Sequence, residues 1–417
     1  MEKSGKFRLT SLERNWILYD VGNSAFVLMV APFTPFFFNA LAAAGGLSSV
    51  EYLAYWGYAS SAVTIITAVL SPILGTVADT KGFKKPIFIL CVFVGIVGCC
   101  AMGAASAWLP FLVIFVIAKV GFSGSLVFYD SMLSDVTTPE RMDEVSSRGY
   151  AWGYIGSCVP FVVCLGLVLG AGSIGISQMT ALNLALLLTA AWWLLTTLPL
   201  LKSYKQLHYV EVEKHAVRQS FARIGHTLRH LPEDKQVFWF LLAFFCYIDG
   251  VYTIIDMATA YGTALGLDTT GLLLALLVTQ IVAFPSALIF GRLSNKYPSA
   301  KLIPVCIAAY AGIAVFAFFL TQQWQFWVLA VIVGMFQGGV QALSRSHFAK
   351  IIPPEKSGEY FGLFDICGKG ASFLGTMIVS VGSQLTGSAN VGVGSLIVLF
   401  IVGFVLFRVS CRQGETV

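Results

Sequence analysis

Long apolar runs alternate with short polar segments along the whole chain. A bilayer core of about 30 Å needs roughly 20 apolar residues in a helix. Strand-type alternation is not sustained anywhere, which favours helices over a β-barrel. Twelve runs are long enough to span a bilayer: 15–41, 52–78, 86–106, 110–134, 148–170, 178–201, 236–262, 270–293, 301–320, 324–348, 359–385 and 391–408. The pattern therefore predicts an all-α integral membrane protein with twelve transmembrane helices.

Composition supports this prediction and excludes several function classes. Hydrophobic residues make up 57% of the 417 residues and charged residues only 11%, whereas soluble domains carry about 25% charged residues. A cytosolic enzyme, a disordered chain and a nucleic-acid binder are all excluded by so little charge. Eight of the nine cysteines fall in apolar runs, and no Cys/His metal spacing occurs. We therefore expect neither a disulfide scaffold nor a metal site.

Catalytic motifs are also missing from the chain. No Gly-x-x-x-x-Gly-Lys-Ser/Thr loop, His-Glu-x-x-His pair or Gly-x-Ser-x-Gly elbow is present. Without a phosphate-binding loop the chain cannot hydrolyse ATP itself. We expect no enzymatic activity and no cofactor, so a gradient must drive any uphill movement.

The basic residues set the orientation in the membrane. Of the 26 Lys and Arg residues, all but Lys119 and Lys369 fall on the side that holds both termini. The loops of the other side carry acids instead, Glu51 and Asp268. Lys and Arg accumulate on the cytoplasmic side of membrane proteins. We therefore expect a multi-pass membrane protein with both termini in the cytoplasm.

One long polar segment, residues 202–235, separates two sets of six runs. It predicts an N-terminal six-helix half at 1–201, a cytoplasmic linker at 202–235 and a C-terminal half at 236–417. Within the linker, apolar residues recur at helical spacing (Val217, Phe221, Ile224, Leu228 and Leu231). That spacing, with Arg residues between, predicts an amphipathic helix on an anionic membrane surface.

The two halves repeat each other. A shift of 216 aligns the loop after the second run with the loop after the eighth, Gly75 with Gly291 and Asp79 with Asn295. A shift of 215 aligns Pro139-Glu140-Arg141 with Pro354-Glu355-Lys356. The nearly constant period indicates duplication of a six-helix unit. Parallel repeats of this kind are typical of one large class of alternating-access carriers.

The loop Gly75-x-x-x-Asp79-x-Lys81-Gly82-x-Lys84-Lys85 resembles the cytoplasmic signature of the major facilitator superfamily, although Thr80 stands where a basic residue usually follows the Asp. Further segments resemble its vacuole-effluxer-like branch: Trp16-x-x-Tyr19-Asp20-x-x-Asn23-Ser24-Ala25-Phe26, Ser146-Ser147-x-Gly149-Tyr150-Ala151-x-Gly153-Tyr154-x-Gly156, Tyr247-x-Asp249-Gly250 and Gly338-Gly339-x-Gln341-Ala342-x-Ser344-Arg345-Ser346. The resemblance covers essentially the whole chain. It implies secondary transport, with amino-acid export as the activity associated with eukaryotic members.

Polar residues inside the runs are candidate sites, because an ionisable group in the bilayer is costly unless paired or hydrated. The residues that we expect to bind substrate or coupling ion are Asp20, Asn23, Lys119, Asp249, Tyr252, Asp256, Gln280 and Gln341. By superfamily analogy, Lys119 and Asp249 face the cavity from opposite halves. Such a pair can bind a zwitterion, and the carboxylate can carry a proton. The alternative is that each merely pairs with a neighbouring helix.

A second group is expected to form a gate or latch: Gly75, Asp79, Lys81, Gly82, Lys84, Lys85, Asp130 and Arg345. Asp79 can accept the positive end of a neighbouring helix dipole, and the lysines are expected to face anionic headgroups. Asp130 and Arg345 occupy equivalent positions in the repeat with opposite charge. We expect them to pair at the inner gate in the outward-facing state, and Asp20 lines the vestibule or joins that gate.

Together these features predict a secondary active transporter of a small polar solute such as an amino acid. We expect proton coupling, export, and action as a monomer in a bacterial plasma membrane. Two alternatives stay open, namely a membrane-embedded sensor or scaffold without transport, and a drug or metabolite antiporter. Drug antiport is the less favoured, because Val159 rather than Gly precedes Pro160 in the fifth run.

Overall fold

The computed structural model consists almost entirely of long helices. It describes residues 7–211, 225–227 and 229–414, apart from the side chains of residues 31–32, 36, 49–50, 53, 259–260, 264, 269–270, 273 and 369–373. The helices, in chain order, are α1 (Ser11–Ala44), α2 (Ser49–Ala78), α3 (Lys84–Gly103), α4 (Trp108–Ser131), α5 (Leu133–Val136), α6 (Met142–Leu169), α7 (Gln178–Ser203), the short 3-10 helix η1 (Leu231–Glu233), α9 (Lys235–Ala264), α10 (Thr269–Ser294), α11 (Ser299–Phe318), α12 (Gln323–Ile351), η2 (Pro354–Lys356), α13 (Ser357–Thr386), α14 (Ala389–Gly394) and α15 (Ile397–Gly414).

Ten of the twelve apolar runs lie mainly in one long helix each, the fourth lies in α4 and α5, and the last lies in α14 and α15. Among the described residues, ten spans are long and apolar enough to cross a membrane, and an eleventh follows if the bent α1 counts as one. The helix α13, which carries Glu359, Asp365 and Lys369, is not among them. The predicted fold, a twelve-helix all-α membrane protein, is confirmed by this architecture and by the structural relatives described below.

Two predicted runs are interrupted. The fourth run stops at Ser131 and continues as the short α5, and the twelfth breaks between α14 and α15. The second break falls where Gly392, Gly394 and Ser395 follow one another closely. Glycine weakens a helix by about 1 kcal/mol relative to alanine, so a break there needs little energy.

Polar caps fix where several helices begin. Thr10 and Glu13 form a capping box at the start of α1, and Ser48 and Glu51 form one at the start of α2. The Asp268 side chain accepts the backbone N–H of Gly271 at the start of α10. Such caps satisfy N–H groups that have no partner within the helix, and each contributes about 1 kcal/mol. Glu51 and Asp268, noted above for their charge, are therefore helix caps.

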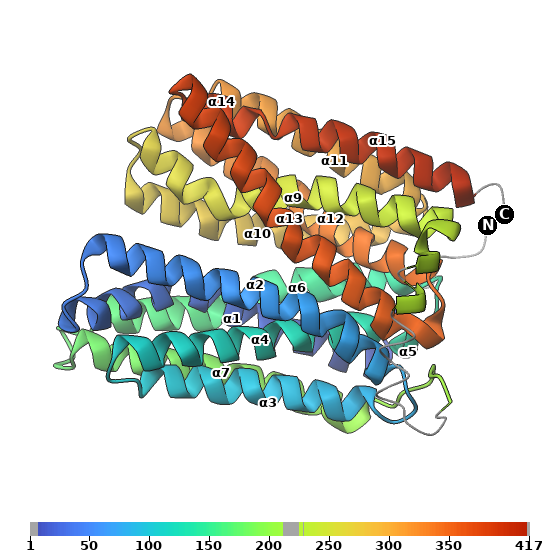
Figure 1. Ribbon diagram of the computed structural model, residues 1–417, viewed down its shortest axis with the longest axis horizontal. Coiled ribbons are helices and arrows are strands. Elements are labelled where there is room, and N and C mark those ends of the chain that lie inside the picture. The colour runs from blue at the N-terminus through green and yellow to red at the C-terminus, as the bar shows by residue number, and fades with distance from the viewer. Residues whose placement is uncertain (1–6, 212–224, 228, 415–417) are drawn as a thin grey trace.

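The helices form two groups (Figure 1). Helices α1 to α7 pack mainly on one another, and helices α9 to α15 do the same. The groups meet where α2 lies against α13 and where α6 lies against α10 and α12. Helix α1 begins and α15 ends at the same end of the bundle, on the right of Figure 1. We call this end the terminal face.

Within the N-terminal group, glycine allows α3 and α4 to approach closely. A Cβ added at Gly121 would lie 2.7 Å from the backbone nitrogen of Gly95 and 2.9 Å from the backbone oxygen of Cys91. Neither backbone atom can rotate away, so a side chain at Gly121 forces the two helices apart.

We predict that Gly121→Ala destabilises the protein by about 1–3 kcal/mol, the usual cost of overpacking. Gly166→Ala is the matched control, because a Cβ at Gly166 meets no atom within 4 Å. The control should melt at the same temperature or higher, since alanine favours helix more than glycine does. Melting curves in detergent measure both variants, and equal melting temperatures would contradict the packing described here.

Candidate functional site

The loop after α2 is attached to the start of α13 through Asp79. One oxygen of the Asp79 carboxylate accepts the backbone N–H of Gly358 at 2.7 Å, and the other accepts that of Glu359 at 2.8 Å. The first N–H groups of a helix lack partners within the helix and carry its positive dipole end. Asp79 therefore caps α13 from the other group of helices.

Lys84 lies beneath this cap and is fully buried. Its ammonium is 3.6 Å from Asp79 and 3.8 Å from Asp135, and it donates a hydrogen bond of 2.8 Å to the Ser357 hydroxyl. The expectation that this lysine faces lipid headgroups is wrong, because two buried carboxylates attract it inward. Burial raises the pKa of Asp79 to about 6, and the neighbouring Lys84 opposes that rise.

The remaining residues of the loop lie nearer the surface. Lys81 is exposed and forms an ion pair of 3.3 Å with Glu211. Gly82 has φ of +80°, a turn conformation that glycine adopts without strain. Lys85 is half-buried in the first turn of α3. Among the lysines of this loop, Lys84 is the one that reaches the contact between the groups.

Glycines bring the two groups into backbone contact at the same place. A Cβ at Gly75 would lie 2.1 Å from the backbone oxygen of Gly358. A Cβ at Gly362 would lie 2.6 Å from the Cα of Pro72. The latch, which we define as Gly75, Asp79, Lys84 and the start of α13, therefore closes only where these glycines have no side chain.

The repeat builds a second contact of the same kind. Asn295, the equivalent of Asp79, donates a hydrogen bond of 3.1 Å to Glu144 in the first turn of α6. A Cβ at Gly291, the equivalent of Gly75, would lie 2.8 Å from the Cβ of Ser147. The loop of each half thus touches the start of one helix in the other half.

Arg345 is the centre of the contact between the groups. It is 2% exposed, although it lies on a membrane-spanning helix, α12. Its guanidinium is 3.0 Å from Asp130 and 3.7 Å from Asp20, and it donates to both the hydroxyl and the carbonyl oxygen of Ser146. Each of these partners belongs to the N-terminal group. The structure thus joins Asp130 and Arg345, and Asp20 lies beside them.

Three aromatic rings enclose the same guanidinium. Its central carbon lies 4.3 Å from the ring centre of Tyr150, 4.7 Å from that of Trp16 and 5.4 Å from that of Tyr129. Ring faces attract cations and also exclude water from them. Sequence reasoning missed this aromatic enclosure, although Trp16 and Tyr150 belong to the segments that carry the family resemblance.

Further hydrogen bonds join the groups around Arg345. Asp143 on α6 accepts the Ser346 hydroxyl at 2.6 Å and lies 2.6 Å from the Lys350 ammonium. The Tyr154 hydroxyl donates to Gln341 at 3.0 Å. On the side of the latch, the Ser71 hydroxyl donates to Asp365 at 2.7 Å. Gln341, expected among the binding residues, thus contacts the other half directly.

Farther from the terminal face, Lys119 on α4 and Asp256 on α9 lie within electrostatic range of one another across the two groups. Asp256 is exposed to solvent even though many protein atoms surround it, and Lys119 and Tyr252 are half-buried. Tyr252 lies near enough to Asp256, Asp130 and Arg345 to interact electrostatically with all three.

Asp249 is placed differently from the expectation. It has no exposed surface, and both of its oxygens accept the backbone N–H of Gly375 on α13 at 2.9 Å. The Thr253 hydroxyl donates to it as well, at 3.2 Å. The structure thus places Asp256 within electrostatic range of Lys119 and holds Asp249 in a contact between two helices of its own half.

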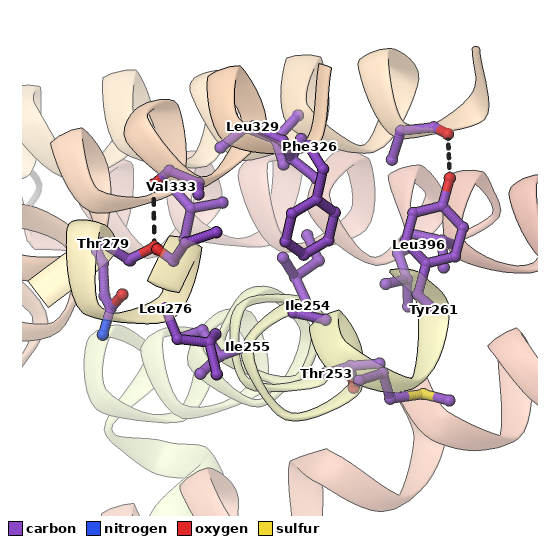
Figure 2. Close-up of a pocket in the computed structure, with 18 of the residues that line it drawn as sticks. Thr253, Ile254, Ile255, Tyr261, Leu276, Thr279, Phe326, Leu329, Val333 and Leu396 are labelled. Atoms are coloured by element: carbon purple, nitrogen blue, oxygen red, sulfur yellow. Dashed lines mark hydrogen bonds between the residues drawn. The ribbon is translucent and has the colours of Figure 1, made fainter. Parts of the chain in front are cut away.

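Two other expected binding residues are also placed within one half. Asn23 is buried and donates to Asp20 at 3.3 Å. Gln280 lines a mainly apolar cavity of about 50 Å³ inside the C-terminal group, with Thr253 and Thr279 among its polar lining residues (Figure 2). That volume holds roughly three or four water molecules.

Residues 212–224 and 228, which include most of the predicted amphipathic helix, lie outside the described residues.

Comparison with known proteins identifies the family. A family model described as vacuole effluxer Atg22 like matches residues 11–140 and 134–416. The chain belongs to this family. The MFS-type transporter YxiO of Bacillus subtilis is 42% identical over 414 residues, which cover 98% of this chain and 97% of YxiO. Autophagy-related protein 22 of Coccidioides immitis is 25% identical over 65% of this chain and 51% of its own length.

Solved structures show the same fold. The human organic anion transporter MFSD10 superposes with a TM-score of 0.74 over 95% of this chain and 99% of its own, at 13% identity. The proton:xylose symporter XylE gives a TM-score of 0.72 over 95% of this chain and 94% of its own, at 10% identity. With YxiO as a relative and this fold, the protein is a major facilitator superfamily transporter.

The glycine contact of the latch gives a first functional prediction. In Gly75→Val the new side chain meets the backbone of Gly358, so the latch cannot close and transport should fall at least about tenfold. Gly57→Val in the same helix is the control, because a Cβ at Gly57 meets nothing within 4 Å. Hydrogen–deuterium exchange of residues 357–364 should rise in Gly75→Val alone. Equal exchange in the two variants would contradict a closed latch.

The placement of Asp249 gives a second functional prediction. Asp249→Ala leaves the Gly375 N–H without its buried acceptor, which costs about 1–3 kcal/mol. We therefore predict a lower melting temperature with an apparent substrate affinity within about threefold of the wild-type value, a change of less than 1 kcal/mol. Thermal melting and initial-rate flux measure the two quantities. A large loss of affinity at normal stability would show that Asp249 binds the substrate.

Proposed function

We propose that this transporter exports a small zwitterionic solute such as an amino acid, coupled to protons, by alternating access. The observation that carries the proposal is the attraction of Lys119 to Asp256 across the two groups, at a depth where Asp256 still meets solvent. An ammonium and a carboxylate placed in this way match the carboxylate and the ammonium of a zwitterion. A neutral sugar needs neither charge.

The opposite charges of Lys119 and Asp256 also support coupling of transport to protons. An isolated charge at this depth costs several kcal/mol, so each member of the pair requires the other or a ligand. When a substrate binds to Lys119, or when the halves separate, the Asp256 carboxylate loses the attraction of the Lys119 ammonium. Binding of a proton then neutralises the carboxylate. The chain carries no ATP-binding loop, so the energy comes from a gradient.

The positive residues support the proposed orientation, and the family name supports the proposed direction. In the sequence, all but two of the Lys and Arg residues fall on the side predicted to hold both termini, which supports a cytoplasmic location for the terminal face. On that assignment the latch and Arg345 close the cytoplasmic side, which corresponds to the outward-facing state of the proposed cycle. The family is described as vacuole effluxers, which supports export, and the Bacillus relative supports a bacterial plasma membrane.

Flux into proteoliposomes tests the proposal. Purified protein should exchange radiolabelled amino acids and should concentrate them when a proton gradient is imposed, and an uncoupler should abolish the concentration. Asp256→Asn and Lys119→Gln should each lower the flux at least about tenfold, because each leaves one charge without its opposite charge at membrane depth. The control is Lys301→Gln, which changes an exposed lysine at the terminal face.

Three outcomes would contradict the proposal. Normal flux in both variants would remove the pair from the substrate path. Flux of neutral sugars without flux of zwitterions would replace the substrate class. Binding of amino acids without any flux would favour the sensor over the carrier.

A further inference from the structure

The first residues of the linker between the halves fold back onto the latch. We call residues 204–211 the strap. The backbone of Val210 pairs with the loop after α2, donating to the Asp79 carbonyl at 2.8 Å and accepting from Lys81 at 3.2 Å. The Gln206 side chain accepts the Gly82 N–H at 2.9 Å and donates to the carbonyl oxygen of Ala78 at 3.1 Å. The strap thus fixes both sides of the turn that carries Asp79.

The same segment surrounds Asp135, which follows α4 on the short α5. The Tyr204 hydroxyl donates to one carboxylate oxygen at 2.6 Å. The backbone N–H groups of Leu207 and His208 lie 3.2 and 2.9 Å from the other oxygen, and the His208 ring nitrogen lies 3.0 Å from it. Both oxygens of a fully buried carboxylate are therefore occupied by the strap.

The donors on Asp135 affect Lys84, which lies between Asp135 and Asp79. The Lys84 ammonium is 3.8 Å from the Asp135 carboxylate and 3.6 Å from the Asp79 carboxylate, and it donates a hydrogen bond to Ser357 in the other half. An ionised carboxylate has about four lone-pair sites, so each donor that occupies one leaves fewer sites for a nearby cation. The strap's donors thus leave Lys84 available to Asp79 and Ser357.

We infer that the strap is a positioning element of the latch, which satisfies Asp135 so that Lys84 is directed across the interface between the halves. The contacts of the strap named above go to the N-terminal group alone, so it moves with that group when the halves separate. The linker is then more than a tether, because its first eight residues set the strength of the closed gate. The inference does not depend on the identity of the transported solute.

Tyr204→Phe tests the inference, since it removes one hydroxyl and keeps the ring in place. Asp135 then lacks a donor and draws Lys84 toward itself, which weakens the latch. Hydrogen–deuterium exchange of residues 357–364 should become roughly tenfold faster, as expected for one lost hydrogen bond to a charged group. The control is Lys205→Ala, which alters an exposed neighbour on the same strap.

A second substitution separates positioning from simple support. In Tyr204→Phe combined with Asp135→Asn, no unsatisfied carboxylate competes for Lys84, so exchange at 357–364 should return to within about twofold of wild type. Melting temperatures of all variants identify any that fail to fold, and His208→Ala, which removes a different donor, then replaces Tyr204→Phe. Unchanged exchange of residues 357–364 in both Tyr204→Phe and His208→Ala would overturn the inference. So would faster exchange that Asp135→Asn does not restore, because the strap would then act only as a mechanical support.

Discussion

The structure depends on one buried cation, Arg345, which one group of helices inserts into a socket made by the other. A guanidinium within a membrane bundle is stable only when charges, hydrogen bonds and rings replace its water. Asp130, Asp20 and Ser146 supply the first two, and three aromatic rings complete the socket. Since every one of these partners lies in the N-terminal group, separating the halves removes them all together.

The duplication explains why this cation lies where it does. Arg345 and Asp130 are equivalent positions of the two repeats, at a shift of 215, and they touch. Two equivalent residues can meet only near the axis that relates the halves. The loops around the axis repeat as well, but with different chemistry. Asp79 caps α13 as a carboxylate, whereas Asn295 reaches α6 as an amide that donates to Glu144. The latch thus places a carboxylate on helix N–H groups, whereas the second contact places an amide on a carboxylate.

The sequence predicted those features that depend on local pattern. Apolar runs are a property of single helices, and they yielded the twelve-helix fold. The repeat also showed that Asp130 and Arg345 are equivalent. It did not show that Asp256, and not Asp249, lies within electrostatic range of Lys119, because the relative depth and rotation of helices in different halves are set by packing. Asp249 could not have been assigned to Gly375, since its partner there is a backbone N–H that any residue provides. The strap was missed for the same reason, because much of its pairing is between backbone groups.

The most direct test of the central claim is the distance between the halves at both faces, with and without the Arg345 charge. Nitroxide labels at Glu140 and Glu355, exposed equivalents of the repeat, report on the terminal face. Labels at Ala44 and Thr321, also exposed, report on the opposite face. The native cysteines are first replaced. Pulsed electron–electron double resonance in lipid should then show a short distance between the two labels of the terminal face when Arg345 is present. In Arg345→Gln we predict a longer terminal distance together with a shorter opposite one. Unchanged distances, or a terminal face that opens while the opposite face stays open, would contradict a gate held by this buried cation.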